Sequence, residues 1–124
     1  STIDAIAARD RKLAMKLLAE HLQTGESPLQ LLSMFAWQLR ILLSQKDLME
    51  RGMTVQEIAQ KLKLHPFAFQ KSFAAVQHFS LNELKELYKK VFSLDLAFKT
   101  GRGNPDQLLH LFVASAATKE KQRS

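Results

Sequence analysis

The chain has 124 residues, of which 46% are hydrophobic and 24% are charged, a composition typical of one ordinary globular domain. It contains no cysteine, which excludes disulfide staples, thiolate catalysis and cysteine metal sites and favours a cytoplasmic setting. No apolar run approaches the roughly 20 residues that span a bilayer, so no membrane association is expected. The net charge of +6 owes part of its excess to the tail TKEKQRS and does not by itself predict nucleic-acid binding.

Apolar residues recur at helical spacing along almost the whole chain, and no stretch alternates with the period of a strand. The sequence therefore predicts an all-α fold, a compact bundle of about six or seven helices. Residues 1–117 are expected to form this single domain, because no repeat or low-complexity linker divides them. After Ala117 the apolar pattern stops, so residues 118–124 are predicted to be a polar, disordered tail.

The first full helix is predicted from about Asp10 to Thr24, where Gly25 ends it as a left-handed residue. The next helix begins with Ser27 as N-cap and Pro28 at the first helical position, and it closes near Gly52. Apolar residues line two sides of this second helix. We therefore expect it to be central, with neighbours on both flanks.

The later helices are indicated by their start signals, which are capping residues or prolines. In chain order these signals are Thr54 with Glu57, His65 with Pro66, Ser80 with Glu83, and Asn104 with Pro105. The helices that follow the two capping boxes are expected to end near Leu62 and near Thr100.

The segment DLAFKTGRGN, residues 95–104, has the lysine, threonine and glycines of a phosphate-binding loop. In a P-loop, however, the lysine and threonine follow the second glycine and open a helix that comes after a strand. Here the order is reversed and the segment follows a helix. We therefore interpret Gly101 as the residue that ends this helix, and expect no nucleotide or other cofactor.

Asp95 and Lys99 stand four residues apart on the helix that ends near Thr100, the spacing of a weak surface ion pair. A second interpretation pairs Asp95 with Arg40, the one charge in the middle of the apolar central helix. A partly buried guanidinium requires an acceptor. We favour a structural Arg40–Asp95 ion pair over a solvated Asp95.

No catalytic or metal-binding constellation is visible. The four histidines are dispersed and none forms the i, i+4 pattern with acids that metal-binding helices use. No serine has a recognisable nucleophile context, and no carboxylate pair suits acid and base roles. We expect no catalytic residue and no metal ligand in this domain; a hydrolase or transferase would need a pocket of converging titratable groups.

The segment MTVQEIAQKLKLHPFAFQKSFAAVQHF supports an alternative function. A short capped helix, a tight connection and a second helix have the outline of a helix-turn-helix, which reads DNA with its second helix. The first turn of that helix offers Phe67, Ala68 and Phe69, where base-reading polar residues are expected. Only Gln70 and Lys71 have suitable chemistry, so helix packing is the simpler interpretation.

Three short motifs in this order resemble a known family. They are Gln38-Leu39-Arg40, then Leu64-His65-Pro66-Phe67 followed by Lys71, then Asp95 to Gly101. Together with the flanking helices, they are similar to the C-terminal domain of the bacterial DNA polymerase III delta subunit, a clamp-loader subunit. The likeness covers nearly the whole chain.

The resemblance implies a role in DNA replication, in the cytoplasm beside the nucleoid. Members of this family join delta prime and the gamma or tau subunits in a pentameric collar, which supports loading of the sliding clamp onto primed DNA. The clamp is gripped by an amino-terminal part of the parent that these residues do not include, and the parent has no ATPase site of its own. The domain is therefore expected to be a non-catalytic assembly module.

Large aromatic side chains concentrate binding energy where they are desolvated, so we expect Trp37, Phe67 and Tyr88 to contact neighbouring subunits. For Trp37, a place in the domain's own core is an equally good interpretation. The resemblance also implies that the loop after Lys99 faces primed DNA, so that Lys99 and Arg102 touch phosphate.

Overall fold

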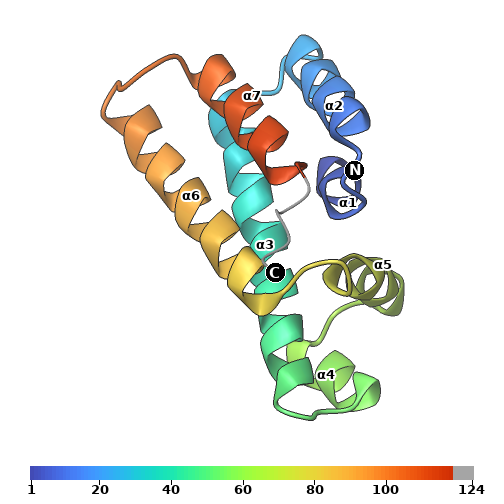
Figure 1. The fold of residues 1–124 in the computed structure, drawn as a ribbon. Coiled ribbons are helices and arrows are strands. Elements are labelled where there is room, and N and C mark those ends of the chain that lie inside the picture. Colours follow the sequence, from blue (N-terminus) through green and yellow to red (C-terminus); the bar gives the residue numbers. More distant parts are fainter. Residues whose placement is uncertain (119–124) are drawn as a thin grey trace, which may run out of the picture.

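A computed structural model describes residues 1–118, which fold into seven α-helices (Figure 1). The helices are α1 (Thr2–Ala7), α2 (Arg11–Gln23), α3 (Pro28–Glu50), α4 (Val55–Leu62), α5 (Pro66–Val76), α6 (Leu81–Lys99) and α7 (Pro105–Ala116). The all-α prediction is confirmed. Of the predicted polar tail, only Thr118 is among the described residues, and 119–124 lie outside them.

Two of the expected capping motifs form in full. The Gln30 amide donates to the Ser27 hydroxyl at 3.1 Å at the start of α3, and the Glu57 amide donates to the Thr54 hydroxyl at 3.2 Å at the start of α4. The Thr54 amide in turn donates to the Glu57 carboxylate at 2.9 Å. Hydrogen bonding of the Glu57 carboxylate to Thr54, first of all to the Thr54 backbone amide, lowers the pKa of Glu57, so the box stays intact at neutral pH.

The predicted box at the start of α6 forms only in half. The Glu83 amide donates to the Ser80 hydroxyl at 3.0 Å, as expected for an N-cap. The Glu83 carboxylate instead turns away from the Ser80 backbone and pairs with Arg9. A charged partner is a stronger attraction for a carboxylate than one backbone amide, which explains the difference.

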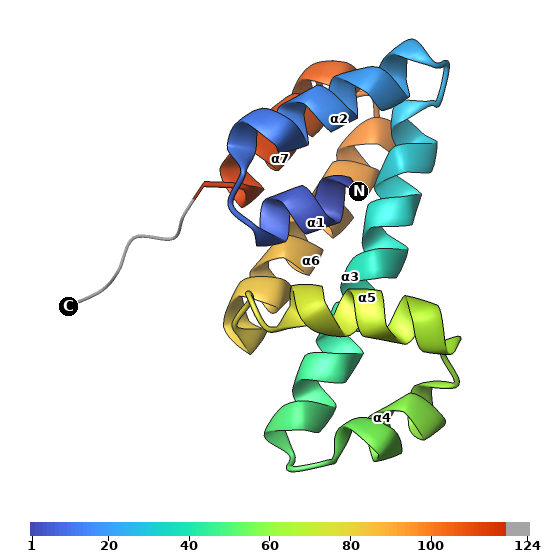
Figure 2. The same ribbon diagram turned by 90° about the vertical axis from the view of Figure 1, so that its right-hand side faces the viewer.

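The short helix α1 was not expected from the sequence. Its six residues give fewer than two turns, too few for an apolar period to be visible. Ser1 caps it through a box with Asp4, and Ile3 and Ile6 are buried in the core. In Figure 2 this helix lies between α2 and α5, and it contacts both.

Helix α3 is the centre of the fold, as its two apolar sides predicted. It contacts α4, α5, α6 and α7, and α6 runs beside it in the opposite direction (Figure 1). The main core lies around its first two thirds and includes the fully buried Leu31, Phe35 and Leu39. The Phe35 ring meets Phe112 of α7 with 6.3 Å between ring centroids.

A second, smaller core forms where α4 and α5 meet the end of α3, around Leu48, Ile58 and Phe69. Between the two cores lies Gln45 of α3, which is fully buried. Its side-chain amide donates to the Ser72 hydroxyl of α5 at 3.0 Å, while no partner among the described residues reaches its carbonyl oxygen. A polar contact therefore lies between the two apolar clusters, which still meet through Met49 and Phe73.

Candidate protein–protein interface

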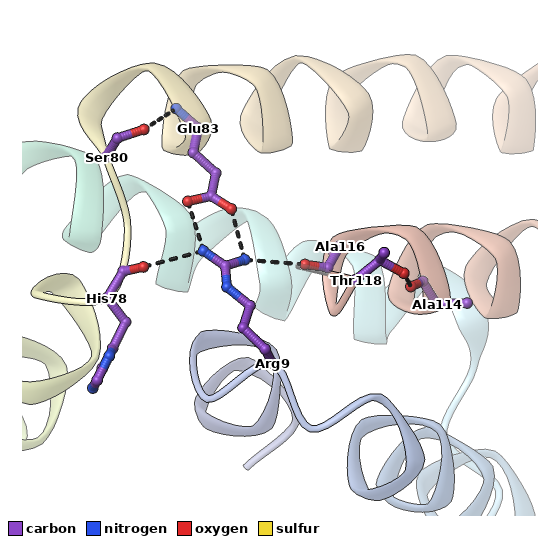
Figure 3. Close-up of polar contacts among 7 residues, drawn as sticks. All are labelled: Arg9, His78, Ser80, Glu83, Ala114, Ala116 and Thr118. Carbon is purple, nitrogen blue, oxygen red and sulfur yellow. Dashed lines mark hydrogen bonds and ion pairs between the residues drawn. The ribbon is translucent and has the colours of Figure 1, made fainter. Parts of the chain in front are cut away.

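Among the described residues, the side chain with the most polar partners is that of Arg9, in the turn between α1 and α2 (Figure 3). Its guanidinium forms two parallel bonds with the Glu83 carboxylate, with nitrogen–oxygen distances of 2.6 and 2.7 Å. It also donates to the His78 carbonyl at 3.1 Å and the Ala116 carbonyl at 3.4 Å. The same group lies 5.2 Å from the centre of the Phe79 ring.

This cluster joins the α1–α2 turn to the α5–α6 connection, the start of α6 and the end of α7. Each hydrogen bond that the Arg9 guanidinium donates is accepted by another group of the protein. The Arg9–Glu83 pair is therefore a structural brace rather than an acid–base centre. The sequence did not reveal it, because Arg9 belongs to the charged run RDRK and looks like any exposed base. Its left-handed backbone, with φ of 59°, is a second feature that no sequence pattern announced.

Two of the three predicted aromatic anchors are exposed. Trp37 of α3 exposes 54% of its surface and Phe67 of α5 exposes 72%. The interpretation that Trp37 fills the domain's own core is therefore wrong. Tyr88 of α6 is half-buried and packs against the main core.

The sequence did not single out the most exposed apolar pair of α6, Phe92 and Leu96, which expose 72% and 58% of their surfaces. Phe92 forms the rim of a hollow of about 150 Å³ between α3 and α6. The α3 wall of the hollow contains two small residues, Ser33 and Ala36. The sequence did contain a signal for this exposed pair. Phe92 and Leu96 are four residues apart, on one face of the helix, and both lie outside the apolar stripe that contains Leu87 and Val91.

A second hollow, of about 170 Å³, lies where α3 meets α1 and α5. Trp37, Ile41, Leu64 and Ala68 are among its apolar lining residues. Trp37 is thus at the edge of an apolar surface that includes the connection between α4 and α5.

The predicted Arg40–Asp95 ion pair is not formed. The Asp95 carboxylate pairs with Lys99, one turn further along α6, at 3.0 Å. Arg40 is exposed and lies beside Trp37 and Leu64. The premise of a partly buried guanidinium was wrong because Arg40 lies on the outer face of α3, where water solvates it.

The segment at 99–104 ends α6 and begins α7. Gly101 adopts φ of 71°, and the Arg102 amide donates to the Ala97 carbonyl at 2.9 Å, which closes the last turn of α6. Asn104 then caps α7 by accepting from the Gln107 amide at 3.1 Å. This geometry supports a helix-to-helix turn instead of a phosphate cradle. Lys99 and Arg102 are both exposed.

The two helices of the helix-turn-helix alternative are α4 and α5. Helix α5 packs against α1 and α3, and its first turn exposes Phe67 and Ala68, with Gln70 and Lys71 following. The exposed surface at the start of this helix is thus largely apolar, unlike one that reads base edges.

Within residues 1–118, no three or more histidine, aspartate or glutamate side chains gather as a metal site would require. In the same range, no helix combines the length and the apolar character needed to cross a membrane.

Residues 1–116 match the family described as the DNA polymerase III delta subunit, C-terminal domain, and the chain belongs to this family. It is a clamp-loader delta domain, as the three sequence motifs indicated. It is 29% identical over 111 residues to the DNA polymerase III subunit delta of Bacillus subtilis strain 168, a match that covers 90% of this chain and 32% of the relative.

The solved structure of the Bacillus subtilis DNA clamp loader delta protein matches with a TM-score of 0.85 and 28% identity. That match covers 94% of this chain and 34% of the other. The chain therefore spans about a third of the length of these relatives, and the similarity concerns their C-terminal part.

Proposed function

We propose that this domain is a non-catalytic assembly module, which packs against gamma or tau and delta prime in the collar of a cytoplasmic clamp loader. In this proposal the domain supports loading of the sliding clamp onto primed DNA, while the clamp is bound by an amino-terminal part of the parent. Its contacts include Trp37, Phe67 and, at the rim, Tyr88.

The observation that carries this proposal is the exposure of large apolar side chains on a domain whose core is already well packed. Trp37, Phe67 and Phe92 each expose more than half of their surface, although exposed aromatics are costly for a protein that stays alone in water. Aromatic side chains are the groups that dominate protein–protein binding once a partner covers them.

The proposal is tested by mixing the full-length protein with gamma or tau and with delta prime of the same organism. Size-exclusion chromatography with light scattering should show a complex, and a parallel titration with duplex DNA should show none at physiological salt. Tight, salt-sensitive duplex binding without any complex with the subunits would favour the helix-turn-helix alternative instead.

Contact with DNA in the assembled loader is a further part of the proposal and concerns Lys99 and Arg102. Arg102→Glu should slow clamp loading onto primed DNA at low salt, by roughly threefold to tenfold, because one phosphate contact becomes a repulsion. Asp106→Asn, which removes a nearby exposed charge at the start of α7, is the control. A loading rate that Arg102→Glu leaves unchanged at every salt concentration excludes this contact.

A further inference from the structure

The outer face of the α3–α6 pair is apolar at one end and basic at the other, and its exposed side chains are not part of the core. Helices α3 and α6 are antiparallel, and the hollow between them is lined by Ser33 and Ala36 of α3 and by Tyr88, Phe92 and Asp95 of α6, among others. One turn before Ser33 stands Leu29, and one turn after Phe92 stands Leu96. These two exposed leucine side chains lie at the same end of the hollow, because the helices run in opposite directions.

The other end of this face is basic. Arg40 follows Ala36 by one turn of α3, and Lys85 and Lys89 precede Phe92 by one to two turns of α6. All three cations are exposed. The nearby carboxylates already face lysines of the same helix: Glu86 lies 3.8 Å from Lys89, and Asp95 lies 3.0 Å from Lys99.

We infer that this α3–α6 face binds an amphipathic helix of one neighbouring collar subunit, with its apolar side chains over the hollow and its acidic residues beside Arg40 and Lys85. This inference rests on the proposed assembly function and names the surface and the chemistry of the partner. Small residues between exposed apolar ones form a groove into which the ridge of a packing helix fits. Lys89 already faces Glu86, but Arg40 and Lys85 have no ion-pair partner among the described residues and require an acidic complement when the face is desolvated.

The charge pattern favours an acidic helix over two other possible partners, a second copy of the chain and DNA. In a symmetric contact, a second copy of the chain, with a net charge of +6, would present this same cationic face, whose carboxylates Glu86 and Asp95 already face lysines. DNA would suit the cations but would leave Phe92 and Leu96 exposed. An acidic amphipathic helix would cover the exposed apolar side chains and also pair with the cations.

The first test measures the affinity of the full-length protein for gamma or tau and, separately, for delta prime. Phe92→Ser with Leu96→Ser, and Arg40→Glu with Lys85→Glu, should each weaken binding of the same one subunit by about tenfold or more. Two matched controls lie on other helices: Leu111→Ser on α7, and Lys12→Glu with Lys16→Glu on α2. The controls should leave the affinity for that subunit within about twofold.

Circular dichroism should show native helix content for every variant, because all the replaced side chains are exposed. If the unsubstituted protein binds neither subunit, the proposed function itself fails. If it binds and the face variants bind equally well, or the controls weaken binding as much, only the α3–α6 inference fails.

A second test identifies the occupant directly. A photoreactive phenylalanine analogue at position 33 or 85 is cross-linked in the assembled loader, and the attached peptide is identified by mass spectrometry. The expected peptide lies in a helix of the partner whose residues near position 85 are acidic. A cross-link to a basic segment, or to a second copy of this chain, would overturn the inference.

Discussion

Replacing Glu83 with alanine should lower the free energy of unfolding by about 3 kcal/mol, because it leaves the Arg9 guanidinium without its bidentate partner in a largely buried place. The two side chains expose only 20% and 13% of their surfaces, so water does not readily replace the lost carboxylate. Urea denaturation followed by circular dichroism at pH 7 measures the change. The effect should exceed that of any surface ion pair of the domain.

Two comparisons separate the brace from ordinary effects on a helix. Glu86→Ala changes an exposed residue of the same helix, which makes only a 3.8 Å contact with Lys89, and it should cost less than about 0.5 kcal/mol. The double variant with Arg9→Ala should be less destabilised than the sum of the single variants by roughly 1–3 kcal/mol. Additive losses would show that the two side chains do not stabilise the fold through each other.

Phe35→Ala is expected to cost about 3–5 kcal/mol, since this side chain is fully buried at the centre of the main core and its removal leaves a cavity. The lost ring also ends the contact with Phe112, which holds α7 against α3. A fall in the midpoint of thermal unfolding, together with weaker near-ultraviolet dichroism, measures the effect.

Phe92→Ala is the matched control because the residue type is the same and 72% of the side chain is already in water. It should change stability by less than about 0.5 kcal/mol, although it should impair assembly. Equal destabilisation by the two changes would contradict the placement of one phenylalanine inside the core and the other on its surface.

Much of this fold could be predicted from local signals. The side chains of Ser27, Thr54 and Asn104 each accept from the amide three residues ahead, so the start of a helix depends on a few adjacent residues. The central place of α3 followed from its two apolar sides. The half-formed box at Ser80 could not be predicted, because two donors compete for the Glu83 carboxylate. One is the local Ser80 amide, and the other is Arg9, 74 positions earlier in the chain.

The surface was harder to predict than the core. Trp37 and Phe67 were expected to be contact residues and are exposed, yet the same apolar pattern also allowed Trp37 to be buried. The Arg40–Asp95 prediction was wrong because even the central helix has a side that faces water, and a place in the middle of an apolar helix does not say which side a residue lies on. Whether an aromatic residue is inside or outside depends on which helices pack beside it, and single-sequence periodicity does not contain that information.

The smaller apolar cluster has a consequence for the dynamics of the domain. Helix α4 contributes its one buried side chain, Ile58, to that cluster, whereas α5 also contributes Ala75 and Val76 to the main core. Helix α4 can therefore lose its contacts with the end of α3 while the main core stays closed. Amide protons of α4 should therefore exchange with deuterium sooner than those of the first half of α3. Residues 55–62 are then the part of the domain that opens first and that can adjust its position as a neighbour docks.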